Sequence, residues 1–455
     1  MPAFRASALL AALFVSSAVH AADVTVKLGA GDGFEITDNA GAIDRLRVDE
    51  ATGNVSRNGA LFVHTTGTSN TFVGAGAGNT GTSGPGHNTG LGRAALQSIG
   101  PGAFNTAVGA YALGANTSGY SNSAVGMSAL RLNSTGSDNS AFGAYALRGN
   151  TSGSENSAFG RWALSGNSMG GRNSALGFMA LQQNGSGYSN AAFGWNAMHK
   201  NLTASQNSAF GNMALYENQT GAFNSAFGSY ALASSTAGAR NSAFGKNALF
   251  ATTTGSDNAA FGFSALQNTI GARNVAVGRY AGINQTTGND NIYLANQGVA
   301  GESGQIKIGT AGTHTGTTIA GISGATSSGG IAVLVNASGK LGTTTSSARF
   351  KQNVRDMDHA SDFVMKLRPV AFEYLEEAVG AEESKETQYG LIAEEVAEVA
   401  PELIAPDAEG RPWSVKYHEL PALLLNELQK QERVIAEQRA VIAKLSERIE
   451  RLEAR

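Results

Sequence analysis

Ser346 and Lys351 are the side chains of this 455-residue chain whose types and spacing could support a reaction. A serine hydroxyl is a weak nucleophile until a base takes its proton, and a lysine can be that base when burial lowers its pKa. Together they would carry out nucleophilic catalysis by a serine. A serine and a lysine five residues apart are also expected by chance, so the surrounding sequence has to decide.

The composition excludes several other kinds of site. The chain has no cysteine, which removes disulfides, thiolate metal ligands and a cysteine nucleophile. Its seven histidines are scattered, so we expect no metal site and no cofactor. A formal net charge of −3 excludes binding to nucleic acid or to a membrane surface through the charge of the whole chain.

The composition changes near residue 345. Residues 346–455 hold 15 of the 32 Lys and Arg and 22 of the 35 Asp and Glu, but 3 of the 59 Gly. The candidate dyad therefore opens a charged C-terminal region that follows a Gly-rich one. The chain joins two different kinds of protein.

The Gly-rich region is a 17-residue repeat. Asn followed by two small residues, an apolar residue and Gly begins at Asn88, and Asn70 is an irregular forerunner. Asn274 arrives one residue early and Asn291 resumes the spacing. A fixed short period predicts a mainly β solenoid over 88–290. The regular members are Asn105, Asn122, Asn139, Asn156, Asn173, Asn190, Asn207, Asn224, Asn241 and Asn258.

Each repeat supplies too few apolar residues to fold alone. The unit reads Asn-Ser-Ala-Phe-Gly-x-x-Ala-Leu, and we expect the Phe and Leu of stacked units to form apolar ladders inside the coil. The Asn side chains would stack as an amide ladder. The Gly suits a corner with positive φ or close backbone approach. The pattern leaves open whether Gly-x-x-Ala-Leu forms a second strand or one helical turn.

The repeats resemble the head repeats of trimeric autotransporter adhesins, which carry Asn-Ser-x-Ala-x-Gly motifs, and the solenoids that precede chaperone domains in phage tail fibres. This chain ends in a charged helix instead of a membrane-anchoring β-barrel. The rod could present a surface or serve as a spacer. Asp138, Glu155 and Asp257 share one corner of the repeat, so they lie along the stack instead of facing each other across a glycosidase cleft.

Several motifs follow the dyad in order. They are Ser346-Ser-Ala-Arg-Phe-Lys351, Leu367-Arg-Pro-Val-Ala-Phe-Glu-Tyr374, Tyr389-Gly-Leu-Ile-Ala-Glu-Glu-Val396 and Val415-Lys-Tyr417, within a region that we predict to be α+β. Residues 346–455 resemble the intramolecular chaperone domain of phage endosialidases and tail fibres, a self-cleaving serine peptidase family.

The resemblance implies that Ser346 is the nucleophile, that Lys351 is the general base and that Thr345–Ser346 is the bond cleaved. A serine beside its own preceding carbonyl is held at a high effective concentration. Ser347 stands where many phage members have Asp, and Arg349 fits a positioning role.

The last helix, from about residue 420, carries a heptad pattern. Apolar residues at 428, 435, 442 and 449 define one seam position, and Leu424, Leu445 and Leu452 the other, which Gln431 and Gln438 interrupt. This pattern predicts a coiled coil. An amphipathic helix packed on its own domain is the alternative. The pattern does not decide between dimer and trimer, and the resemblance implies a homotrimer.

The remaining segments are an N-terminal export signal and the regions at the two ends of the rod. Arg5, the apolar run Leu9–Val15 and a small-residue site ending at Ala21 predict a signal peptide over 1–21. We expect a β-rich cap over 22–87 and a β-rich transition over 291–345. No other stretch is long and apolar enough to cross a membrane, so we expect a secreted or cell-surface protein.

The sequence thus predicts an exported homotrimeric fibre or adhesin-like protein whose C-terminal domain, 346–455, drives trimerisation and then cleaves itself off. One alternative is a fibre with a non-cleaving trimerisation domain. Another is a spike enzyme that degrades glycans. The sequence names no glycan or receptor for the rod and indicates no nucleic-acid partner.

Overall fold

The computed structural model describes residues 33–37, 44–81, 84–322, 325, 327–336, 338–379, 383–407 and 409–454. The predicted signal peptide, 1–21, lies outside these residues. The chain divides into two compact units, residues 1–318 and 319–455. No helix among the described residues is long and apolar enough to span a membrane.

Four antiparallel strands precede the solenoid. They are β1 (Phe34–Thr37), β2 (Asp44–Val48), β3 (Val55–Arg57) and β4 (Ala60–His64), each paired with the next. β4 pairs antiparallel with β5 (Thr71–Val73), and every later pair in this sheet is parallel. The parallel stack therefore begins at β5, one coil before Asn88.

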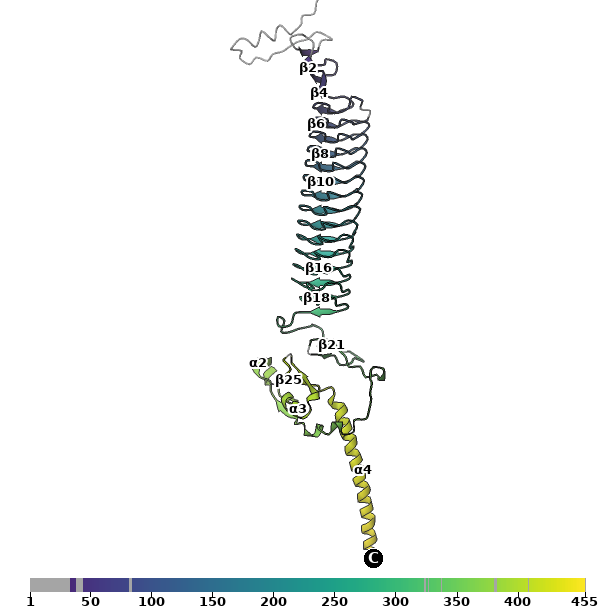
Figure 1. Cartoon of the computed structure of the whole chain (residues 1–455), viewed down its shortest axis with the longest axis vertical. Coiled ribbons are helices and arrows are strands. Elements are labelled where there is room, and N and C mark those ends of the chain that lie inside the picture. The colour runs from purple at the N-terminus through teal and green to yellow at the C-terminus, as the bar shows by residue number, and fades with distance from the viewer. Residues whose placement is uncertain are drawn as a thin grey trace, which may run out of the picture. The chain divides into compact units, whose positions relative to one another are not determined.

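The repeats form a β-solenoid of about 14 turns over residues 71–308 (Figure 1). Each turn places one three-residue strand beside the equivalent strand of the next turn in parallel register, as Ser140↔Ser157 and Phe142↔Phe159 illustrate. The predicted solenoid is confirmed. Its strands after β5 are β6 (Thr89–Leu91), β7 (Thr106–Val108), β8 (Ser123–Val125), β9 (Ser140–Phe142), β10 (Ser157–Phe159), β11 (Ser174–Leu176), β12 (Ala191–Phe193), β13 (Ser208–Phe210), β14 (Ser225–Phe227), β15 (Ser242–Phe244), β16 (Ala259–Phe261), β17 (Val275–Val277), β18 (Ile292–Leu294) and β19 (Ile306–Ile308).

The core of most coils is made of Ala and Leu, with Phe72 of β5 and Tyr293 of β18 buried near the two ends, and the prediction that the Phe of the repeat lies inside was wrong. Ala141 and Leu147 are fully buried, as are their equivalents along the stack. Phe142 and Phe159 keep 38% and 41% of their surface exposed. Side chains alternate along a strand, so a buried central Ala turns the neighbouring Phe outward. The prediction followed hydrophobicity and overlooked this alternation.

The predicted amide ladder is present. Asn156 is fully buried, and its Nδ2 donates to Oδ1 of Asn139 at 3.1 Å and to the Gly170 carbonyl at 2.9 Å. Its Oδ1 accepts from the backbone N–H and the side-chain Nδ2 of Asn173. A second column, which includes Asn150, stacks in the same way. The ladders satisfy polar groups that the narrow coil buries away from water.

The Gly of each repeat is required by both its φ angle and its surroundings, as predicted. Gly160 has a φ of +133°, and a Cβ there would lie 2.5 Å from the carbonyl oxygen of Gly177 in the next coil. Such a contact is far shorter than real Cβ atoms show, so any larger residue would push two coils apart. Neighbouring strands can approach at the usual spacing only without that side chain.

The segment Gly-x-x-Ala-Leu is neither a strand nor a helical turn. Tyr111 and Leu113 both have left-handed φ angles, of 61° and 50°. Their N–H groups donate to neighbouring coils, Tyr111 to the Arg93 carbonyl at 2.8 Å and Leu113 to the Ala129 carbonyl at 3.0 Å. The backbone groups of these turns thus form hydrogen bonds with the neighbouring coils, just as the strands do. Propensity scales for helix or strand do not predict such a turn.

The second unit contains a small region of strands and short helices. β20 (Leu334–Val335) pairs with β21 (Leu341–Gly342), β22 (Val370–Phe372) with β23 (Gln388–Gly390), and β24 (Ile404–Pro406) with β25 (Pro412–Val415). The helices are α2 (Glu376–Val379) and α3 (Ala393–Val399), with 3-10 turns η1 (Ala348–Phe350), η2 (Asp358–Ser361), η3 (Val364–Lys366), η4 (Glu383–Lys385) and η5 (Pro401–Leu403). Its core is small and comprises Val396, Ala400, Leu403 and Val415.

Helix α4 (Leu420–Glu453) is 34 residues long and buries none of its side chains in the single chain. It follows the predicted start of the C-terminal helix at about residue 420. At its start, Leu420 and Leu423 pack against the small core, whereas Leu428, Ile435, Ile442 and Ile449 are between 46% and 62% exposed. From Leu428 onward, the apolar seam has no partner among the described residues of its own domain.

Candidate active site and chaperone region

A single 3-10 turn sets the geometry of the candidate dyad. Across η1, the N–H of Phe350 donates to the Ser347 carbonyl and that of Lys351 to the Ala348 carbonyl, both at 3.0 Å. This turn folds the chain back, so that Lys351 Nζ donates to Ser346 Oγ at 3.3 Å. The two residues that the sequence singled out therefore lie within hydrogen-bonding distance, as a serine and its base must.

The dyad is open to solvent in the single chain. Ser346 and Lys351 are both exposed, and Phe350 between them is 62% exposed. Arg349 stacks its guanidinium over the Phe350 ring at 4.9 Å, which orders the turn without touching the serine. Because burial is what makes a lysine a proton acceptor, this arrangement has the contacts of a dyad but not its enclosure.

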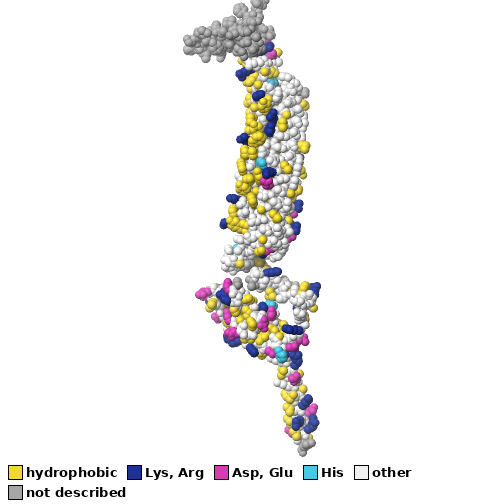
Figure 2. Space-filling model, in the orientation of Figure 1, with side chains coloured by type: hydrophobic (Ala, Val, Ile, Leu, Met, Phe, Trp, Pro, Cys, Tyr) yellow, Lys and Arg dark blue, Asp and Glu magenta, His cyan; other side chains and the backbone are white. Residues whose placement is uncertain are grey.

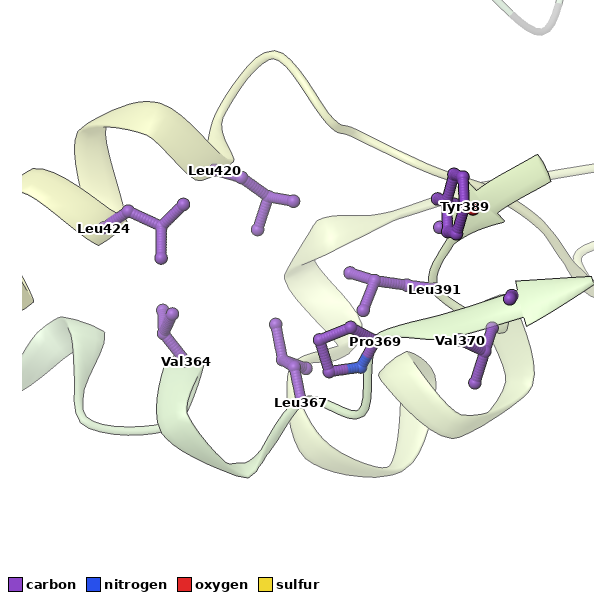
Figure 3. Close-up of a pocket in the computed structure, with 10 residues that line it drawn as sticks. Val364, Leu367, Pro369, Val370, Tyr389, Leu391, Leu420 and Leu424 are labelled. Atoms are coloured by element: carbon purple, nitrogen blue, oxygen red, sulfur yellow. The ribbon is translucent and has the colours of Figure 1, made fainter.

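The motifs behind the dyad converge on one apolar groove of about 480 Å³ (Figure 3). Leu367 and Pro369 come from the motif at 367–374, Leu391 comes from the motif at 389–396, and Leu420 and Leu424 come from the start of α4. The groove carries no carboxylate, histidine or lysine. It is therefore suited to bury apolar side chains. Leu424 also belongs to the predicted coiled-coil seam, so groove and seam meet at this residue.

Polar contacts hold the same motifs together. The Tyr417 hydroxyl accepts from the Leu391 N–H at 2.9 Å, and a Cβ on Gly390 would lie 2.7 Å from that hydroxyl. Arg368 forms a two-pronged ion pair with Glu395, and the hydrogen bond from the Arg368 guanidinium lowers the pKa of that carboxyl. These residues have structural roles. Glu395 is one half of an ion pair that joins two of the motifs.

A polar cluster that sequence reasoning missed ties α4 to η2. Ser361 is fully buried, donates to Glu427 Oε1 at 2.5 Å and accepts from Asn426 Nδ2 at 2.5 Å. Lys430 Nζ lies 2.5 Å from Asp362 and 2.6 Å from Glu427. Its hydrogen bonds lower the pKa values of both carboxyl groups. The sequence signal for this cluster was the run of polar residues Asn426, Glu427 and Lys430, which lie outside the two seam positions of the heptad.

Several carboxylates of the rod form ion pairs between coils. Glu155 pairs with Arg172 at 3.1 Å, and Asp257 lies 2.6 Å from Arg240. The Arg240 hydrogen bond lowers the pKa of Asp257. Within the described part of the chain, no group of three His, Asp or Glu side chains is placed to hold a metal.

Comparison with known families supports the C-terminal motifs. No curated protein matches the chain. Residues 346–405 match the model of a peptidase family described as the chaperone of endosialidase, and the matched segment begins at Ser346 and takes in the motifs that line the groove.

Proposed function

We propose that this protein is an exported homotrimeric fibre or adhesin-like protein whose C-terminal domain, 346–455, drives trimerisation and then releases itself by cutting Thr345–Ser346. The observation that carries the proposal is the chaperone-of-endosialidase match, placed directly after a long β-solenoid. On this proposal, residues 1–21 are removed on export and the rod, 22–345, is the mature product.

Trimerisation is assigned to α4. Its two seam positions are apolar over four and a half heptads except at Gln431 and Gln438, and they are exposed in the single chain; a parallel coiled coil buries such a seam. Gln431 and Gln438 would form two polar layers that fix the register. Leu424 would extend the contact into the groove beside it.

A rod of near-identical turns has a physical need for such a device. Each coil presents almost the same strand as the next, so copies that meet along their lengths can pair one or more coils out of step. A helix that trimerises first would align all copies from one end. Cleavage afterwards would separate the aligned rod from its template and leave it kinetically trapped.

Cleavage is assigned to Ser346 as the nucleophile and Lys351 as its base, which the 3.3 Å contact supports. The serine Oγ would attack the Thr345 carbonyl carbon, Lys351 would take the hydroxyl proton and return it to the departing amine, and water would release the ester. Because both side chains are exposed in the single chain, neighbouring copies would have to supply the burial. Cleavage would therefore follow trimerisation.

Three variants of the full chain test this assignment. Ser346→Ala and Lys351→Met should accumulate uncut protein, whereas Ser347→Ala, a change at the adjacent exposed serine, should be cut like the wild type. Denaturing gels and N-terminal sequencing of the small fragment give the readout. A trimeric wild-type protein that stays uncut would refute the cleavage step and leave the non-cleaving trimerisation domain. The ion-paired, solvent-exposed carboxylates of the rod give no support to a glycan-degrading spike.

A further inference from the structure

One face of the solenoid carries an unbroken column of outward apolar side chains. The third residue of every strand from β5 to β19 belongs to it, and the register pairs each member with the next, from Val73 to Ile308. Phe142, Phe159 and Phe261 are 38–42% exposed. Figure 2 shows a band of hydrophobic side chains that runs along the rod.

The aromatic part of the column presents ring edges to the solvent. Phe193, Phe210, Phe227 and Phe244 stack on one another along the rod, with centroids 4.7–4.9 Å apart and planes within 6° of parallel. Each ring face is therefore covered by the ring of the next coil. A sugar ring packs on an aromatic face, which is not available here, whereas an apolar surface packs well against ring edges.

The exposed area is that of a protein interface. With about 200 Å² for a whole aromatic side chain, Phe142, Phe159 and Phe261 each expose roughly 80 Å², and the column over 15 strands amounts to on the order of 1,000 Å². A monomeric protein rarely exposes a continuous apolar patch above about 300–600 Å². A stable interface buries about 800 Å² on each partner.

The partner must be as long and as regular as the column itself. None of the outward side chains of strands β5 to β19 is charged, and those beside the column are mostly Ser, Thr or Ala, which permit close approach. The charged residues of the rod lie mostly in the turns outside these strands, where Glu155 and Arg172 pair between coils. Cations such as Arg161 and Lys246 stand two residues after the column. A parallel copy of the same solenoid matches this column in length, period and chemistry.

We infer that this column is the surface along which copies of the rod pack lengthwise, each copy turning its strands toward a shared axis. The inference rests on the proposed trimer and adds to it a second, much longer interface, which would hold the copies together after the C-terminal domain is released. The exposed edges of the stacked Phe rings of one copy would pack against those of its neighbours.

Single cysteines test the inference, because the chain has none of its own. Phe210→Cys places a thiol on the column. Phe223→Cys, in the same coil, places one at a different outward position, where Phe223 is 55% exposed. Both are made in the full chain with Ser346→Ala, so that the C-terminal domain stays attached. Light scattering first measures the mass, and copper-phenanthroline oxidation then forms disulfides between nearby thiols.

The expected result is a trimeric mass for both variants and a covalent dimer, on a non-reducing gel, with Phe210→Cys at least ~5-fold more abundant than with Phe223→Cys. A trimer in which Phe210→Cys does not cross-link, or cross-links no better than the control, overturns the inference while the proposed trimer stands. That outcome would leave the column to a partner of another kind. A monomeric mass for both variants refutes the proposed trimer and this interface together.

Discussion

Replacing Asn156 by Ala tests whether buried amide ladders hold the coils together. The side chain is fully buried and takes part in four hydrogen bonds. After its removal, Gly170 keeps a bond from Asn167, and Asn139 Oδ1 keeps one from the backbone of residue 156. The backbone N–H of Asn173 and one of its two amide hydrogens lose their partner.

The cost follows from these two orphaned donors. A buried polar group left without a partner costs about 1–3 kcal/mol, so the change should weaken the coil by about 2–6 kcal/mol. The effect should stay within the adjacent coils, because each repeat contacts only its neighbours. A single midpoint of unfolding is a poor measure in a repeat array, whose transition is not two-state. Local hydrogen exchange is the better one.

Amides in peptides that cover residues 157–175 should exchange at least about 30-fold faster in Asn156→Ala, while those of distant coils stay unchanged. Glu155→Ala is the matched control. It removes an exposed side chain and its ion pair with Arg172, and should change exchange less than about fivefold. An acceleration below about threefold in Asn156→Ala would show that the ladder does not hold the coil, and the account of the core would fail.

Three further predictions concern other features of the molecule. Gly160→Ala should sharply speed local hydrogen exchange in its coil because its Cβ would meet the Gly177 carbonyl. Gly59→Ala, with positive φ but open space, should cost only about 1–2 kcal/mol. Equal changes in local hydrogen exchange would contradict this. Ile435→Asp on the seam should reduce the mass measured by light scattering to that of a monomer, whereas Ala436→Asp, one residue off the seam, should leave the trimer intact; a trimer in both would remove α4 from the interface. The hydrogen bond from Lys430 lowers the pKa of Asp362 from its ordinary 3.8, so this tie stabilises the fold above that pH and is lost as the pH falls through the lowered pKa. Exchange protection of residues 358–363, corrected for the intrinsic effect of pH, should therefore drop below about pH 4 in the wild type and vary less in Asp362→Asn.

The repeat region shows how far a sequence pattern reaches. The fixed spacing predicted the solenoid, the Asn ladder and the glycine corner, because each is a property of the period and of residue type. The direction of the Phe side chain could not be read from its hydrophobicity alone. Phe142 faces outward because the alternation along the strand turns Ala141 inward, and which of the two residues faces inward is set by the packed coil: near the ends of the stack, Phe72 and Tyr293 take the inward position. The left-handed turn at Tyr111 likewise depends on bonds to neighbouring coils.

In the candidate site, too, some features could be predicted from the sequence and others could not. The resemblance of the surrounding motifs pointed to Ser346 and Lys351, and the 3-10 turn between them brings the two side chains together. The cluster around Ser361 joins residues more than 60 positions apart, so no local pattern could have paired Ser361 with Glu427. The enclosure that would activate Lys351 is also beyond local sequence, because on this account it comes from other copies of the chain.

The intact mass of purified protein expressed from Ala22 onward tests the central claim most directly. The account predicts two species, one that ends at Thr345 and one of 110 residues that spans Ser346 to Arg455. A single chain that runs to Arg455, in a preparation that light scattering shows to be trimeric, would contradict self-cleavage. The C-terminal domain would then be a trimerisation module that stays attached to the rod.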